Sequence, residues 1–194
     1  VVGLGSVLER FPVDQVFVTP VAEPQELAAM AEQVTSQAGI AVKPLRAGDR
    51  FRVQQTAFTV IWPSRRIDAG SVPNNASVVM LVETPAPEPA MRGLRLLMTG
   101  DIEREAQAAI IRAIQVPAVD VVKVPHHGSA NGDPRFPAWS GARAAIISVG
   151  ADNPYGHPRI EAIQSWQQVG ALVLRTDQDG AIAVLANPLA VVKQ

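Results

Sequence analysis

Short apolar runs of strand type alternate with helical segments through the second half of the sequence, and this alternation constrains the fold most. The runs are rich in valine, isoleucine and leucine, and each is too short for a helix. Strands are expected at residues 94–98, 121–124, 144–149 and 172–175, with helices at 102–114, 134–139 and 158–169. Such alternation predicts a layered α/β architecture, with strands inside and helices outside.

The first half carries more closely spaced strands. They are expected at residues 15–18, 41–45, 51–54, 57–62 and 77–83, the last forming a hairpin with 94–98. A helix at 24–37 is expected to use Leu27, Met30, Ala31 and Val34 as its apolar face. With a last strand at 181–185 the total is roughly ten, too many for one flat sheet in a small domain, so two packed sheets are expected. No linker or repeat is visible, which predicts a single domain over residues 1–194.

All three histidines lie on loops that follow expected strands. His126 and His127 stand in Pro-His-His-Gly-Ser after the strand at 121–124, and His157 stands in Tyr-Gly-His-Pro after the strand at 144–149. Asp101 closes a similar loop, Thr-Gly-Asp, after the strand at 94–98. A lone loop histidine is usually a solvated polar residue. Strand ends gather at one rim of an α/β sheet, however, so we expect these four side chains to form one site.

Charge and cysteine content restrict the chemistry. The net charge of −1 gives no overall basic field, so contact with a polyanion would depend on local patches or bound cations. The absence of cysteine excludes disulfides, zinc–thiolate sites and a cysteine nucleophile. No apolar run reaches the roughly 18 residues of a membrane span, and no signal peptide is visible, so the segment itself is expected to be soluble.

Imidazole and carboxylate groups without thiolate suit divalent ions such as Zn²⁺ or Mn²⁺. An aspartate after a glycine at a strand end could bridge two ions, and two ions about 3.5–4 Å apart can hold both the attacking and the leaving oxygen of a phosphodiester. Lys123 and Ser129 are candidate phosphate contacts. A solvated charge and a turn hydroxyl are equally good interpretations of these two residues.

Several segments together resemble a known family. LLMTGD, VDVVKVPHHGS, AIISVGADNPYGHP and LRTDQDGAI, with IWP and NNASVVMLV upstream, are similar in order and spacing to the metallo-β-lactamase-fold domain of ComEC-type DNA internalization (natural competence) proteins. The resemblance covers most of the chain. It implies an αββα sandwich, in which two packed mixed sheets carry outer helices and a divalent-metal site lies at the rim. It also implies that this domain is the C-terminal part of a larger bacterial inner-membrane protein, in an extracytoplasmic or membrane-apposed position.

The resemblance also assigns roles to residues. Asp101, His126 and His157 look like metal ligands, with Asp101 bridging two Mn or Zn ions in the complete domain. The catalytic candidates are His127, His157, Lys123 and Ser129. His126 and His127 remain interchangeable as the ligand. Adjacent residues leaving a strand face opposite ways, so only one of them is expected to bind metal.

The chain departs from the family pattern at its start. Metallo-β-lactamase folds carry their principal metal motif, His-x-His/Asp-x-Asp-His, just before a Gly-Leu-rich helix, and residues 1–8 resemble the segment that follows that motif. We therefore expect an N-terminally truncated fold with an incomplete metal site. Residues 1–194 alone are expected to bind divalent metal poorly and to show no nuclease activity.

The function implied by the resemblance is that of a metal-dependent phosphodiesterase that degrades the non-transported DNA strand during natural transformation. Its partners would be single-stranded DNA, the membrane channel domain of the same polypeptide and other competence proteins. One alternative is a non-catalytic DNA-binding or channel-supporting module, which the net charge of −1 and the missing motif favour. Another is a metallohydrolase acting on a lactone, lactam or thioester, because a fold does not fix its substrate.

Overall fold

The computed structural model describes residues 3–64, 66–86, 88, 91–115, 118–186 and 189–193. Its strands are β1 (Gln15–Val18), β2 (Ala41–Pro44), β3 (Arg50–Val53), β4 (Thr56–Trp62), β5 (Val79–Glu83), β6 (Arg95–Met98), β7 (Val121–Lys123), β8 (Ala144–Ile147), β9 (Leu172–Arg175), β10 (Ile182–Leu185) and β11 (Ala190–Lys193). Its helices are α1 (Leu4–Arg10), α2 (Gln25–Gln37), α3 (Val72–Asn75), α4 (Arg104–Ala113), α5 (Phe136–Ser140), α6 (Ile160–Gln168) and α7 (Thr176–Asp179), with a 3-10 turn η1 (Pro125–Gly128). The predicted α/β class is confirmed.

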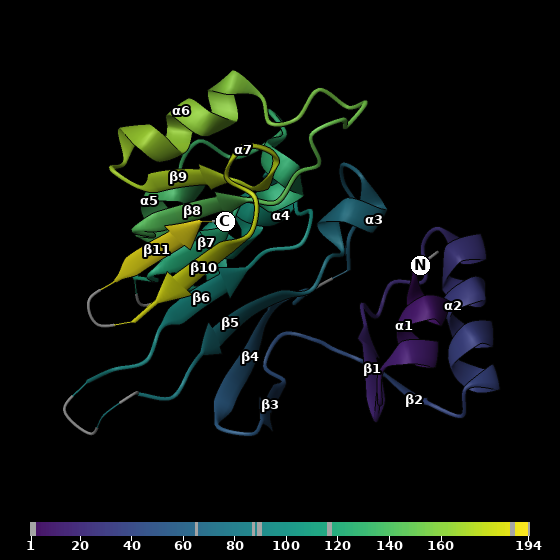
Figure 1. The fold of residues 1–194 in the computed structure, drawn as a ribbon. Coiled ribbons are helices and arrows are strands. Elements are labelled where there is room, and N and C mark those ends of the chain that lie inside the picture. The colour runs from purple at the N-terminus through teal and green to yellow at the C-terminus, as the bar shows by residue number, and fades with distance from the viewer. Residues whose placement is uncertain are drawn as a thin grey trace.

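A seven-stranded mixed sheet in the order β3-β4-β5-β6-β7-β8-β9 forms the centre of the molecule (Figure 1). Strands β3 to β6 are antiparallel neighbours, and the predicted hairpin of β5 and β6 is confirmed. Strands β6 to β9 are parallel, and α4, α5 and α6 lie in their crossover connections. Parallel strands end at the same edge of a sheet, so the loops after β6, β7 and β8 meet there.

The remaining strands form two small sheets, so the second sheet expected from the sequence is divided. Hairpin β10–β11 is antiparallel and lies in front of strands β6 to β9 in Figure 1. Strands β1 and β2 are a parallel pair joined through α2, beside the β3–β4 end of the large sheet. A stack of three rings, Phe17, Phe51 and Phe58, joins the two sheets, with ring centroids 4.7 and 4.8 Å apart.

The parallel half of the large sheet, around β7 and β8, is buried on both faces. One face packs with Ile102 and Ile110 of the α4 region, Phe136 of α5 and Trp166 of α6 in a single hydrophobic cluster, to which Val122, Ala145 and Ile147 of the sheet also belong. The alternate residues Val121, Ala144 and Leu174 are also buried but lie outside that cluster, as the two-residue period of a strand requires. Burial on both faces explains why these strands read as continuous apolar runs.

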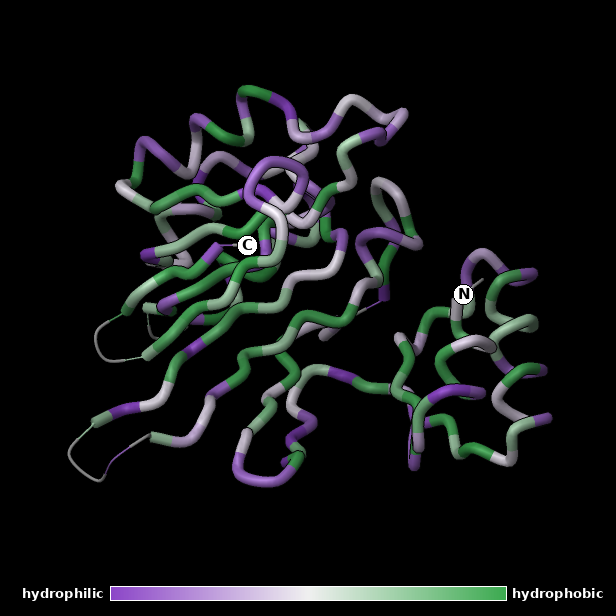
Figure 2. The backbone as a smooth tube through the Cα atoms, in the orientation of Figure 1, coloured by the Kyte–Doolittle hydropathy of each residue, from purple (hydrophilic) through white to green (hydrophobic). Residues whose placement is uncertain are grey.

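Helix α2 differs from its prediction. Leu27 and Met30, expected on its buried face, are 43% and 42% exposed, and Thr35 is the buried residue of the helix. Figure 2 shows hydrophobic residues along both α1 and α2. Among the described residues the main contacts of α2 are with α1 and β2, two small elements that leave Leu27 and Met30 exposed.

Asp120, at the start of β7, connects several strands. Its carboxylate accepts hydrogen bonds from Arg92 Nη1 and Nη2 at 2.7 Å and from the Arg95 backbone N–H at 2.9 Å. Its carbonyl accepts from the Arg143 and Ala144 N–H groups at the start of β8. The residue is 3% exposed, so this end of the parallel sheet depends on a buried polar junction.

Replacing Asp120 with alanine should lower the free energy of unfolding by about 1–3 kcal/mol, because the Arg95 backbone N–H loses a buried acceptor and the half-exposed Arg92 loses an ion-pair partner. The matched control is Glu83→Ala, which removes a half-exposed ion pair with Arg95 and should cost about 1 kcal/mol or less.

Burial raises the pKa of Asp120, but hydrogen bonds from Arg92 and Arg95 outweigh it and leave that pKa lowered. Its contribution should therefore be complete above about pH 4 and decline as the pH falls further. Urea unfolding of both variants across pH checks this, and equal losses would contradict it.

Candidate active site

Loops from the carboxyl ends of β6, β7 and β8 bring the sequence-predicted residues together. Asp101 Oδ1 lies 3.6 Å from His127 Nε2 and 3.5 Å from Lys123 Nζ. The His126 ring centroid lies 5.5 Å from that of His157 and 6.3 Å from that of His127. The structure therefore brings Asp101 and the three histidines to the same edge of the sheet, with Asp101 nearest to His127. Their catalytic and metal-binding roles stay predictions.

The histidine pair does not leave the sheet as an extended strand. Strand β7 ends at Lys123, and His126 and His127 occupy the turn η1 with left-handed backbone angles, φ 46° and 53°. The expectation that strand alternation separates them is wrong, and their rings diverge because of the turn. A left-handed conformation costs a residue with a Cβ about 1–2 kcal/mol, and such strain is concentrated at functional sites.

The ring of His127 is fixed by its neighbours. Nδ1 lies 2.6 Å from the Ser148 carbonyl oxygen, which can only accept a hydrogen bond, so Nδ1 carries the proton. In the neutral ring, Nε2 then presents a lone pair toward Asp101 Oδ1, 3.6 Å away. Two acceptor atoms that face each other at this distance are an arrangement that a bound cation would satisfy.

His157 sits in a loop closed by Asn153, whose side chain bonds both the backbone N–H and the carbonyl of His157. Burial lowers the pKa of His157, and the nearby His126, His127 and Arg159 lower it further, whereas Asp101 raises it. The Nδ1 atoms of His157 and His126 are both buried and form no aligned hydrogen bond within the described residues. The neutral imidazole of His157 is therefore available as a base or a ligand.

Lys123 differs from the phosphate contact suggested by the sequence, because its ammonium group has partners within the protein. Its ammonium donates to the Gly100 carbonyl at 2.9 Å and lies within 3.5 Å of Asp101 Oδ1 and the Val124 carbonyl. Burial lowers the pKa of Lys123, and the Asp101 carboxylate opposes that effect. These contacts connect the Thr-Gly-Asp loop to β7, so the geometry favours Lys123 as a group that positions Asp101.

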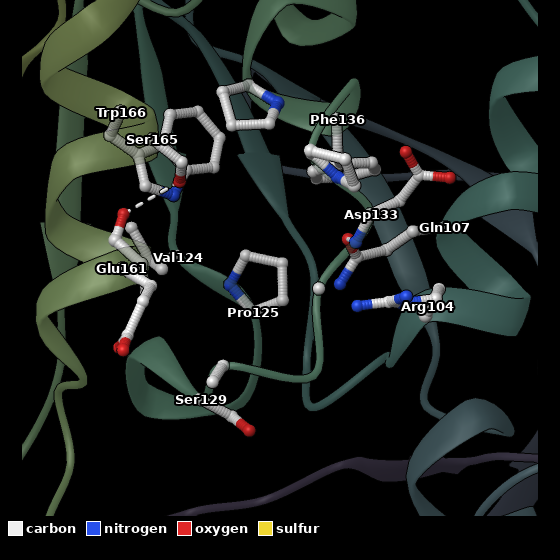
Figure 3. A pocket seen from close by; sticks show the side chains of 15 residues that line it. Arg104, Gln107, Val124, Pro125, Ser129, Asp133, Phe136, Glu161, Ser165 and Trp166 are labelled. Carbon is white, nitrogen blue, oxygen red and sulfur yellow. Dashed lines mark hydrogen bonds between the residues drawn. The ribbon is translucent and has the colours of Figure 1, made fainter.

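Ser129 belongs to the other side of the η1 turn. Its Oγ accepts a hydrogen bond from the Asn131 N–H at 3.2 Å. The residue lines a pocket of about 210 Å³, shown in Figure 3, together with Arg104, Phe136 and Trp166. The described residues that line this pocket include no histidine. Ser129 therefore borders the histidine turn without joining the cluster.

Sequence reasoning missed Glu103 and the asparagines around it. In the structure Asn74 and Asn131 both donate to the Glu103 carboxylate, and the Glu103 N–H donates to Asn75 Oδ1. The bond partners are 28 to 29 residues apart, so local pattern could not pair them.

The donor types of the cluster fit a divalent ion, but their arrangement does not complete a site. Histidine nitrogens without aligned partners and an aspartate oxygen are the ligands that Zn²⁺ and Mn²⁺ accept. Yet no three histidine, aspartate or glutamate side chains among the described residues are arranged to hold one ion. No catalytic step is therefore assigned to a metal on these residues.

Comparison with known proteins places this geometry in context. Over 164 residues, 84% of its length, the chain is 32% identical to ComE operon protein 3 of Bacillus subtilis (strain 168). The chain resembles part of a ComE operon protein. This confirms the resemblance to ComEC-type proteins, although the chain spans about a fifth of that relative's length. No protein-family model matches the chain.

A solved structure from Parabacteroides distasonis, named as a metal-dependent hydrolase, is 15% identical with a TM-score of 0.49. The match covers 88% of this chain and 79% of that chain.

Within the residues that the structure describes, no helix is both long enough and apolar enough to cross a membrane.

Proposed function

We propose that this chain is the metal-dependent phosphodiesterase domain of a ComEC-type DNA uptake protein, which degrades the non-transported strand during natural transformation. One observation carries the proposal: Asp101 and the three histidines, from three separate loops, gather at one sheet edge in a chain related to ComE operon protein 3. Its partners would be single-stranded DNA, the channel domain of the same polypeptide and other competence proteins at the inner membrane.

Each residue has a role that follows from its surroundings. Asp101 supplies the negative charge that attracts a cation. Lys123 holds the loop that carries Asp101 against β7. His127, oriented by the Ser148 carbonyl, presents Nε2 toward Asp101 and can take or give a proton. His157 offers a neutral imidazole from the opposite loop. A bound divalent ion, with further ligands from outside the described residues, would supply Lewis acidity toward the phosphate.

The test is cleavage of single-stranded DNA with Mn²⁺ or Zn²⁺. It compares residues 1–194 with a longer polypeptide, in which the same residues carry additional native sequence at their N-terminal end. We expect cleavage by the longer polypeptide, its loss on chelation, and little or none from residues 1–194. A longer polypeptide that binds DNA but does not cleave it with either ion would refute the proposal.

A second candidate is a non-catalytic module that binds DNA or supports the channel. The incomplete ligand arrangement among the described residues favours it. It predicts DNA binding that is insensitive to chelation and unchanged by Asp101→Asn, whereas the nuclease proposal predicts that metal strengthens binding.

A further inference from the structure

Glu103 is a buried carboxylate with an unusual set of partners. The residue is 7% exposed, and its Oε1 and Oε2 accept hydrogen bonds from Asn74 Nδ2 at 2.9 Å and Asn131 Nδ2 at 2.8 Å. A carboxylate only accepts hydrogen bonds, so both asparagines must present their NH₂ groups to it. With one amide on each oxygen, Asn74 from α3 and Asn131 from the loop after η1, the carboxylate plane is fixed.

The position of Glu103 at a helix start does not account for this arrangement. It is the N-cap residue of α4, but its side chain makes no capping hydrogen bond. The carboxylate instead reaches the asparagines and the histidine turn. Its backbone N–H, which donates to Asn75 Oδ1 at 2.8 Å, adds a further connection to α3.

The group that this carboxylate faces is His126. Glu103 Oε1 lies 3.2 Å from His126 Nδ1, which is buried. The distance is short enough for a hydrogen bond, but the His126 ring is not aligned with the Glu103 carboxylate. A modest rotation of the ring would complete the bond. Because Nδ1 and Nε2 lie on different edges of an imidazole, Nδ1 turned toward Glu103 leaves Nε2 on the edge away from it.

We propose that Glu103 is a positioning residue for His126. It holds the proton on Nδ1 and so keeps Nε2 as the nitrogen with a free lone pair, which can bind a cation or accept a proton. The inference rests on the proposed function only in treating His126 as a residue that binds a cation or accepts a proton. Asn74 and Asn131 hold the carboxylate, so the Asn-Asn segment before β5 takes part in the site through Glu103.

The test is the tautomer of His126, read from ¹⁵N side-chain chemical shifts at a fixed alkaline pH, where imidazole is neutral. The chain has only three histidines, so the signals can be assigned by substitution. We expect wild-type His126 to carry its proton on Nδ1. Glu103→Gln should lower the ratio of the Nδ1–H to the Nε2–H form about tenfold, because a charged acceptor is replaced by a neutral amide.

The matched control is Glu105→Gln on the same helix, whose Oε2 accepts from Asn75 Nδ2 and which should leave the ratio unchanged. A wild-type His126 with its proton on Nε2 overturns the proposal, as does a Glu103→Gln variant with an unchanged ratio. If Glu103→Gln does not fold, the wild-type spectrum and Glu103→Asp, which shortens the carboxylate and should reduce the ratio, decide the matter. A protein that shows the expected tautomers but no DNA cleavage contradicts the proposed function alone.

Discussion

Replacing Asp101 with asparagine is expected to lower the rate of single-stranded DNA cleavage by the longer polypeptide at least about a hundredfold. Asparagine keeps the size and one acceptor oxygen but removes the charge that faces His127 Nε2 and Lys123 Nζ. Losing one preorganised electrostatic contact at a reacting centre typically costs 10²–10³ in rate, so about a hundredfold is a lower bound. The measurement is the single-turnover cleavage rate, with metal content determined on the same samples.

Ser129→Ala is the control for Asp101→Asn. Ser129 lines the pocket on the far side of the η1 turn and offers one neutral hydroxyl, so its loss should change the rate about tenfold at most. A rate for Asp101→Asn equal to that of wild type, with full metal content, would contradict the metallohydrolase account and support the binding module.

Gly128→Ala should give the second large effect, a loss of about 2–4 kcal/mol in the free energy of unfolding. Gly128 has φ +79°, and a Cβ built on it would lie 2.6 Å from Pro158 Cβ. The strain of a left-handed alanine and the overlap with a rigid ring add together. The overlap would separate the histidine turn from the His157 loop, so cleavage should fall together with stability. Urea unfolding and the cleavage rate measure the two effects.

Gly150→Ala provides the same substitution in the His157 loop without the overlap, since nothing lies within 4 Å of its added Cβ. We expect this control to stay within about 1 kcal/mol of wild type. If Gly128→Ala is as mild as Gly150→Ala in both stability and rate, the close packing of the two loops is not needed for the site.

Much of the fold could be predicted because its signals are local. The strands at 15–18 and 172–175 were predicted with the bounds the structure has, since apolar β-branched runs end at turn residues. The placement of Asp101 and the histidines followed from parallel strands ending at one edge. Helix α3 and strand β11 were not predicted, because Val72–Asn75 and Ala190–Lys193 are four-residue elements with no clear period.

The site details depended on contacts that sequence pattern does not encode. The left-handed backbone at His126 and His127 accompanies long-range contacts, such as the hydrogen bond from the His126 N–H to the Gly100 carbonyl at 3.2 Å, and no local sequence pattern encodes them. Lys123 looked like a free cation because its partners, Gly100 and Asp101, are more than 20 residues away. The Glu103 network was invisible for the same reason. In each case tertiary contact outweighed local preference.

The central proposal, that Asp101 and the three histidines contribute to one cation-binding site, is tested most directly by Mn²⁺ titration of residues 1–194 with the histidine ring signals observed by NMR. A paramagnetic ion broadens nearby nuclei even when binding is weak. We predict that the signals of His126, His127 and His157 broaden together, before those of the rest of the protein, and that Asp101→Asn abolishes this selectivity. Histidine signals that stay sharp while surface carboxylates elsewhere respond would contradict the account.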